Sequence, residues 1–173
     1  LQHIHDEVYG NAWRGAFNVT VKQPTPFGVD AVFLSGKKNE EEFWFCQISP
    51  AAPNAKPGGK LDKRPKPFST PATIGPIEIV AGTGRVYKHM KEINRGTDIV
   101  PDAAIEYGAY FNLILYDVAN HGTTARIGVE AEYILTDTAG FSIDFDGTVS
   151  VLSNYASITE VDPNALVNGH LHL

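Results

Sequence analysis

Residues 103–152 decide the fold class, and they read AAIEYGAYFNLILYDVANHGTTARIGVEAEYILTDTAGFSIDFDGTVSVL. Apolar and polar side chains alternate in three segments of this stretch, which is the pattern of a β-strand with one buried face. Turn-forming residues separate the segments at 120–122 and at 137–140. The stretch therefore predicts a three-stranded antiparallel meander with strands at 107–116, 125–135 and 141–151.

Each strand of this predicted meander has an apolar face and a polar face. The polar faces carry Tyr110, Asn112 and Tyr116 on the first strand, Arg126, Glu130 and Glu132 on the second, and Asp144 and Asp146 on the third. We expect Asp144 and Asp146 to be solvated, because carboxylates are rarely buried without a partner. Whether the remaining polar groups are solvated too or line a cavity depends on which face of the meander points inward.

Further strands are predicted at 16–22, 29–35, 43–48 and 75–80, with a break at residues 81–84. The pattern of residues 85–94 is ambiguous: Val86, Met90 and Ile93 fall at helical spacing with Gly96 as a cap, but the alternation favours a strand from Val86 to about Met90. Segment 43–48 is apolar on both sides, which indicates a strand covered on both faces or a subunit interface. Residues 151–158 either continue the sheet or begin a new strand. Asp162 followed by Pro163 is typical of a helix start, and Gly169 of a helix end, so we predict a single helical turn there.

Residues 49–75 differ in composition from the rest, with six prolines and five basic residues. Proline lacks a backbone donor and fixes φ, so this density predicts a long Pro/Lys-rich loop outside the sheet. Such a loop is either a lid over a pocket mouth or a solvated basic segment. Its basic cluster is the place where an anionic ligand or partner would dock.

The composition fits one soluble domain over residues 1–173. No apolar run approaches the ~20 residues that a membrane span needs. The net charge of −6 argues against nucleic acid as a partner. A single cysteine, Cys46, excludes an intramolecular disulfide and a cysteine-rich zinc site, and it favours a reducing compartment such as the cytoplasm. With about eight to nine strands and little helix, the predicted architecture is a single closed antiparallel β-barrel, because closure removes exposed edges.

Both ends of the chain carry a His-x-His pair, His3 with His5 and His170 with His172. Two such pairs on adjacent strands would offer four imidazoles to a metal ion. Terminal segments are commonly exposed, so we expect solvated histidines and predict no metal site.

Residues 96–117 carry a resemblance to a known family. The run Gly96-Thr97-Asp98 through Asp102, then Ile105-Glu106-Tyr107 and a long strand ending at Asp117, resembles a family of small calycin-like (lipocalin-like) β-barrel proteins of microbes and fungi. The resemblance implies a barrel with a central cavity. Related barrels include lipocalin-like carriers and cyclases of natural-product pathways. It assigns no catalytic residue, and the Pro/Lys-rich loop departs from the family's pattern.

The sequence contains no nucleophile elbow, phosphate loop, zinc-spaced cysteine set or dinucleotide fingerprint. We therefore expect a cofactor-independent isomerase, cyclase or lyase that folds a small hydrophobic molecule in the barrel cavity and moves a proton on it. The catalytic candidates are Glu130, Glu132, Arg126 and His89. The candidates for substrate contact are Tyr110, Asn112, Tyr116, Tyr133 and Trp44.

Two carboxylates beside an arginine suit proton transfer, and an imidazole titrates near neutrality. His121 lies in a predicted turn and is the weaker of the two histidine candidates. Two alternatives stay open: a non-catalytic barrel that binds a small ligand, and a structural or assembly module. Either one is compatible with a homo-oligomer.

Overall fold

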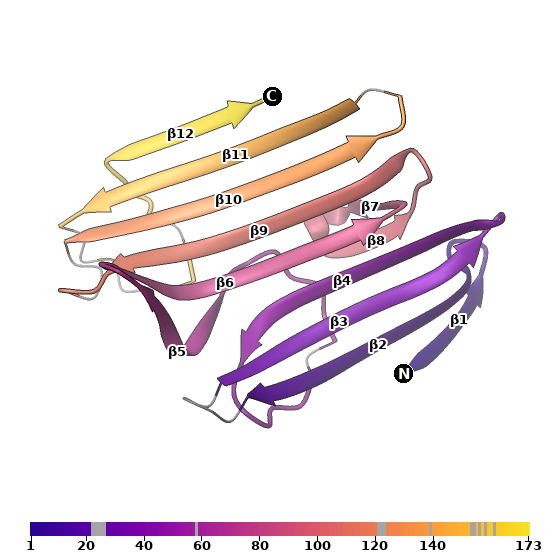
Figure 1. Cartoon of the computed structure of the whole chain (residues 1–173), viewed down its shortest axis with the longest axis horizontal. Helices are drawn as coiled ribbons and strands as arrows, with labels where there is room; N and C mark the ends of the chain where they lie inside the picture. The colour runs from indigo at the N-terminus through magenta and orange to yellow at the C-terminus, as the bar shows by residue number, and fades with distance from the viewer. Residues whose placement is uncertain are drawn as a thin grey trace.

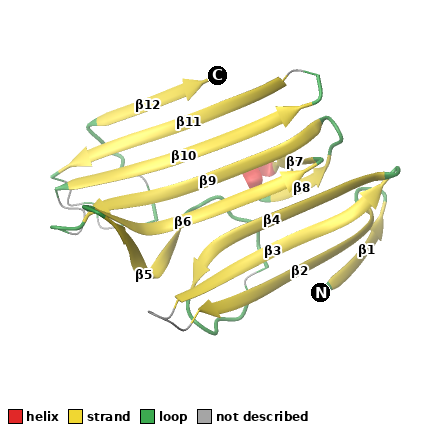
Figure 2. Ribbon diagram, in the orientation of Figure 1, coloured by secondary structure: helices red, strands yellow, loops and turns green. Residues whose placement is uncertain are grey.

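The structure is a computed structural model of the whole chain, and it describes residues 1–21, 27–57, 59–120, 124–138, 140–152, 155, 157, 159, 160 and 162–173. These residues form an all-β protein, as predicted, and no α-helix occurs among them (Figures 1 and 2). The strands are β1 (Gln2–Asp6), β2 (Gly10–Val21), β3 (Phe27–Lys38), β4 (Glu41–Ala51), β5 (Lys66–Ile74), β6 (Ile77–Lys88), β7 (Met90–Ile93), β8 (Asp98–Pro101), β9 (Ile105–Asp117), β10 (Ala125–Thr136), β11 (Gly140–Val151) and β12 (Val167–His172).

One large antiparallel sheet contains all strands except β7 and β8, which pair with each other. Its strand order is β1-β2-β3-β4-β6-β9-β10-β11-β12, and β5 adds to β6 beside β4. The predicted meander is confirmed as β9, β10 and β11. In the described residues β1 and β12 are the two ends of this order, so closure of the sheet into a single barrel stays a prediction.

The two faces of the sheet differ in chemistry. We call the side that carries Phe43, Phe45, Tyr87 and Tyr110 the inner face, since these side chains are all buried. The core lies between this face and the β7–β8 pair, where Met90 and Ile99 pack against Phe43, Phe45 and Tyr87 from the sheet; Ala12, Leu34 and Ile105 complete the cluster. Figure 1 shows β7 and β8 beside β6 and β9. The opposite side, the outer face, carries exposed apolar residues such as Trp44, Phe111 and Phe145.

Segment 43–48 is covered on one side only in the single chain. Phe43 and Phe45 are buried, whereas Trp44 and Ile48 on the other side are exposed. The prediction that both faces of this strand are covered is therefore wrong for the single chain. Burial within the single chain does not explain why Trp44 and Ile48 are apolar.

The Pro/Lys-rich segment 49–75 is shorter as a loop than predicted. β4 extends to Ala51, and β5 takes residues Lys66–Ile74 despite Pro67 and Pro71. β5 pairs with β6 alone, and its register shifts between Pro67 and Ala72, so neither proline has to donate to a second neighbour. The strand tolerates proline because it is an irregular strand with a single partner.

Strand β6 runs through the glycine-containing residues 81–84, where a break was predicted. A Cβ on Gly82 would lie 2.9 Å from Leu113 Cδ2, so glycine here permits close approach of a neighbouring side chain inside a strand. The strand predicted from Val86 to Met90 is divided at His89, whose φ is +50°. The helical turn predicted over Asp162–Gly169 is also wrong. Only a turn at Asp162 forms, where Ala165 N–H donates to the Asp162 carbonyl, and Gly169 lies within β12.

Nowhere in the described part of the chain does a helix reach the length and hydrophobicity that crossing a membrane requires.

Candidate functional site

The strongest candidate site lies on the inner face, where polar side chains from four strands meet. Gln47 on β4, Arg85 on β6, Tyr110 on β9 and Glu132 on β10 stand in one cross-strand row, because each is paired in register with the next. The neighbouring row carries Thr83, Asn112 and Glu130. A pocket of about 490 Å³ opens at the β10 end of these rows, where Glu130 and Glu132 line it. Its lining includes Lys63, Tyr87, Lys91, Glu92, Arg95, Ile105, Glu130, Glu132 and Ile134.

Glu130 is held by two neutral groups of strand β9. The Tyr110 hydroxyl lies 3.0 Å from Glu130 Oε1, and Asn112 Nδ2 lies 3.4 Å from Oε2. Asn112 Nδ2 also donates to the Tyr110 oxygen at 3.3 Å. The predicted grouping of Tyr110, Asn112 and Glu130 is therefore present as a hydrogen-bonded cluster.

Glu132 has a different environment from Glu130. The Tyr87 hydroxyl donates to Glu132 Oε1 at 3.3 Å, and Lys63 Nζ lies 3.5 Å from Oε2. Lys63 is closer to Glu92 on β7, at 2.6 Å, and its ammonium lies 4.2 Å from the centre of the Tyr110 ring. Lys63, from the predicted basic loop, thus contacts the carboxylates of Glu92 and Glu132 and the ring of Tyr110.

Arg85 lies beneath this cluster with only 2% of its surface exposed. Its Nε donates to Gln47 Oε1 at 2.9 Å and its Nη1 to Glu92 Oε1 at 2.7 Å. The buried Nη2 has no hydrogen-bond acceptor among the described residues. Buried polar atoms are almost always paired, so this nitrogen is an exception among the buried polar atoms described.

The loop before β5 covers the site through backbone contacts. The Lys63 carbonyl accepts from the Tyr110 hydroxyl at 3.1 Å, and the Asp62 N–H donates to Gln47 Oε1 at 3.1 Å. Leu61 packs against the core cluster. The loop is therefore anchored over the inner face by side chains of the sheet.

Both tyrosines of the site are neutral hydrogen-bond donors. Burial raises the pKa of Tyr87 above its ordinary range, and the nearby Glu132 charge raises it further. Burial also raises the pKa of Tyr110, more than the Asn112 hydrogen bond lowers it. Each phenol therefore keeps its proton at neutral pH and donates it to a neighbouring glutamate.

These raised pKa values predict a loss of stability at alkaline pH. Below pH about 10 both tyrosines are protonated in the folded and unfolded chain. Above it they ionise only when unfolded, so each should lower the free energy of unfolding by roughly 1.4 kcal/mol per pH unit. We expect urea titrations from neutral to strongly alkaline pH to show this slope, and Tyr87→Phe and Tyr110→Phe each to reduce it. Exposed Tyr107→Phe is the control, and an unchanged slope in the double variant would contradict the assignment.

Arg126 lies on the inner face but serves another part of the molecule. Its side chain is buried, and it donates to the carbonyls of Tyr155 and Glu160. The rings of Tyr116 and Tyr155 lie 5.4 and 5.1 Å from the guanidinium carbon. Arg126 and Tyr116 thus form a cluster that holds the segment after β11, outside the lining of the Glu130 pocket.

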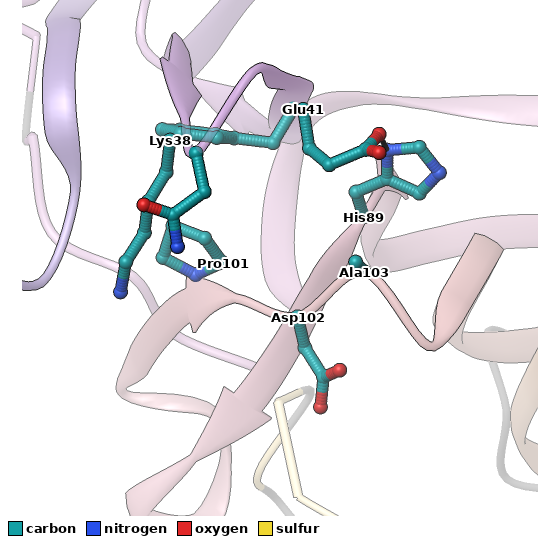
Figure 3. Close-up of a pocket in the computed structure, with 8 residues that line it drawn as sticks. Lys38, Glu41, His89, Pro101, Asp102 and Ala103 are labelled. Carbon is teal, nitrogen blue, oxygen red and sulfur yellow. Dashed lines mark ion pairs between the residues drawn. The ribbon is translucent and has the colours of Figure 1, made fainter.

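His89 is also separate from the glutamates. It lies between β6 and β7, where its Nδ1 is 2.9 Å from the Glu42 carbonyl. It lines a second pocket of about 290 Å³ with Lys38, Glu41 and Asp102. Figure 3 shows the Glu41 carboxylate beside the His89 ring, at 3.8 Å from Nδ1, and the Asp102 side chain pointing away. His121, the other histidine candidate, lies outside the described residues.

The remaining predicted contact residues lie on the outer face. Tyr133 stacks on Phe141 with ring centres 6.1 Å apart, and Trp44 is exposed on β4. Neither Tyr133 nor Trp44 lines the pocket of Glu130 and Glu132.

Asp144 and Asp146 lie on β11 opposite Glu132 and Glu130. They pair with His172 and His170 on the neighbouring strand β12, at 2.7 and 2.9 Å.

The two His-x-His pairs are far apart in the strand order. His3 and His5 lie on β1, His170 and His172 lie on β12, and all four are exposed. Within the described ranges no group of three or more His, Cys, Asp or Glu side chains is arranged to hold a metal ion.

Sequence reasoning missed three charged residues of the site, namely Lys63, Arg85 and Glu92. Arg85 shares its strand face with Thr83 and Tyr87, so a continuous strand through residues 81–84 would have placed it opposite Tyr110. Glu92 belongs to a short strand in a segment whose pattern was ambiguous. Lys63 was recognised only as a member of a basic cluster.

Comparisons with protein-family models, with curated protein sequences and with solved structures found no match to this chain.

Proposed function

We propose that the inner-face pocket is the ligand site and that the protein is a cofactor-independent isomerase or cyclase in which Glu130 takes a proton from the bound molecule. The observation that carries this proposal is the difference between the two glutamates. In the described residues the hydrogen-bond donors to Glu130 are the neutral Tyr110 and Asn112, whereas Glu132 also contacts the Lys63 ammonium. Glu130 is therefore the general base, and Glu132 positions Lys63 and Tyr87.

The rest of the pocket acts by holding the substrate in a reactive conformation. A volume of about 490 Å³ suits a small molecule. Much of the barrier to an isomerisation or cyclisation can be removed by orientation alone, so no covalent nucleophile is needed. The neutral tyrosines fix the carboxylates through hydrogen bonds and leave Glu130 to exchange a proton with the substrate.

The lining narrows the class of substrate. Ile105 and Ile134 offer an apolar wall, while Lys63, Lys91 and Arg95 offer positive charge. The substrate in this proposal is a small molecule with a hydrophobic part and an acidic group, which is more polar than the wholly hydrophobic molecule expected from the sequence.

Replacing the proposed base tests the reaction. The compound that co-purifies with the wild-type chain would be identified by mass spectrometry, and its turnover and binding would be measured. Glu130→Gln keeps the shape of the side chain but cannot take the proton, so we expect turnover to fall by about 100-fold or more with binding retained. Asp146→Asn is the matched control, because Asp146 is exposed on β11 directly opposite Glu130 in register. Equal turnover in wild type and Glu130→Gln would refute the catalytic role.

A non-catalytic carrier is the second candidate. The polar groups at the pocket already have protein partners, with Tyr110 on Glu130, Tyr87 on Glu132 and Lys63 on Glu92. Such a pre-organised site suits selective binding without chemistry. Binding of the co-purified compound with no turnover would favour the carrier.

The predicted closed barrel and the resemblance to calycin-like proteins belong to the same proposal. In a closed barrel the inner face would form the interior, and the Glu130 pocket would occupy the position of a barrel ligand. The cytoplasmic location expected from the single cysteine likewise stays a prediction.

A further inference from the structure

The outer face of the sheet is a broad apolar surface, and β5 covers part of it where Phe68 lies beside Gly82. One row crosses eight strands in register, from β2 to β12, and all of its side chains are apolar. Its large members are strongly exposed, with Phe17 at 45%, Ile48 at 51%, Phe111 at 42%, Phe145 at 36% and Leu171 at 50%. Monomeric proteins rarely leave such a surface in water.

The extent of this surface matches a stable protein interface. Eight strands at a spacing of about 4.8 Å span about 34 Å. Residues two apart on a strand are about 7 Å apart, so three adjacent rows cover roughly 700 Å². A stable complex buries about 800 Å² on each partner, so these three rows alone nearly reach that size.

The outer face has projecting side chains and hollows, a shape that suits packing against a second sheet. Along the row, large and small residues alternate: Phe17 is followed by Ala31, Ile48 by Gly84, and Phe111 by Ala131. Around Gly82 and Gly84 the surface sinks into an apolar hollow of about 250 Å³. Two sheets pack face to face when large side chains of one enter such hollows of the other.

The distribution of charge favours a copy of the same chain as partner. The charged side chains of this face stand at strand ends, such as Lys37, Glu42 and Lys88, and Lys66 at the start of β5; on β2, β3, β4, β6, β9, β10, β11 and β12 the rows between these ends carry no charged side chain among the described residues. Two identical faces can therefore meet without opposing like charges, as a two-fold interface requires. The net charge of −6 disfavours an anionic lipid surface as the occupant.

We propose that two copies of this chain, each with β1 and β12 as the ends of its sheet, pack outer face to outer face and form a two-fold symmetric β-sandwich. Closure of the sheet into a barrel would make this face convex and exclude such packing. The interface then covers Trp44 and Ile48, which explains why segment 43–48 is apolar on both sides. The two inner-face pockets stay open on opposite surfaces of the dimer, so this inference does not depend on the function proposed for them.

Sedimentation analysis of the 173-residue chain at micromolar concentration tests the proposal. We expect a species of twice the 18.8 kDa chain mass. Phe111→Glu would bury two carboxylates, one from each copy, and should weaken the dimer roughly 100-fold. Val8→Glu adds the same charge at an exposed apolar position in the turn between β1 and β2 and should leave the dimer intact. A monomer mass for the wild-type chain would overturn the proposal.

Cys46 provides a second measurement that needs no variant. Its side chain lies on the outer face, half-buried in the single chain. We expect its reaction with a maleimide to be slow at high protein concentration and to accelerate when dilution separates the dimer. A labelling rate independent of concentration would overturn the proposal, as would open-ended assembly or binding of the monomer to phosphatidylcholine vesicles.

Discussion

Gly108→Ala is expected to lower the free energy of unfolding by about 3 kcal/mol, because the added methyl group overlaps a buried and packed aromatic ring. Gly108 lies on β9 opposite Tyr87 on β6, and a Cβ at this position would be 2.0 Å from Tyr87 Cε2 and 2.1 Å from Cζ. Tyr87 is 1% exposed and packs on Phe45. The ring is packed on Phe45 and hydrogen-bonded to Glu132, so the added methyl group must displace either the strand or the ring and disturb these contacts.

Denaturant unfolding of Gly108→Ala beside Gly84→Ala measures this effect. Gly84 lies on the same pair of strands, but on the outer face, and a Cβ there would have its nearest neighbour at 3.7 Å. That substitution should be almost neutral for the dissociated monomer, so both variants are compared at a concentration that separates the proposed dimer. Displacement of Tyr87 would also remove its hydrogen bond to Glu132, so the Gly108 variant should lose ligand binding as well. Equal unfolding midpoints for the two variants would contradict the packing described for Tyr87.

Glu92→Gln is the second substitution with a large expected effect, a loss of about 3 kcal/mol of stability. Glu92 is the ionic partner of Arg85, at 2.7 Å, and the Arg85 side chain is 1% exposed. It also pairs with Lys63 at 2.6 Å. Removing its charge leaves a buried guanidinium without a counter-ion, and the cost of desolvating that guanidinium is no longer offset.

The pair between Lys37 and Glu40 is the matched control for this substitution. Its nitrogen and oxygen are also 2.7 Å apart, but its side chains are 49% and 92% exposed. Water screens such a pair, so Glu40→Gln should leave the unfolding curve unchanged. Equal effects of the two substitutions would show that Arg85 is not as isolated from water as the structure places it.

Much of the sheet was predictable, because its strands alternate in polarity with a period of two residues. The strands that became β2, β9, β10 and β11 carry this pattern over at least six residues, whereas β3 and β4 were predicted from mostly apolar runs next to turn-forming residues. Among the missed strands, three lack the alternation for physical reasons. β5 contains two prolines and has a single partner, and β7 and β8 have four residues each, too few for a period to be seen.

The candidate site was predictable only in part. Tyr110, Asn112, Glu130 and Glu132 were grouped correctly because neighbouring strands of a meander place alternate residues on one face. Arg126 was grouped with them by the same rule, yet its position four residues from Glu130 puts it beside Tyr155 and Glu160 instead. Which face is covered depends on where the loop at residues 59–65 and the β7–β8 pair fold back. Those long-range contacts leave no local pattern in the sequence.

The limited contact between β4 and β6 has a consequence for the order in which the chain folds. These strands pair over only five residues each, Trp44 to Ile48 with Gly84 to Lys88, and this ladder joins the β1–β4 half of the sheet to the rest. Neighbouring strands within each meander are joined by short connections, which cost little loop-closure entropy. The β4–β6 ladder must instead close a long chain segment that includes β5. We therefore expect strands β1–β4 and the β9–β11 meander to be the early folding units, and Arg85, on β6 at the junction, to gain Gln47 as a partner only when they come together.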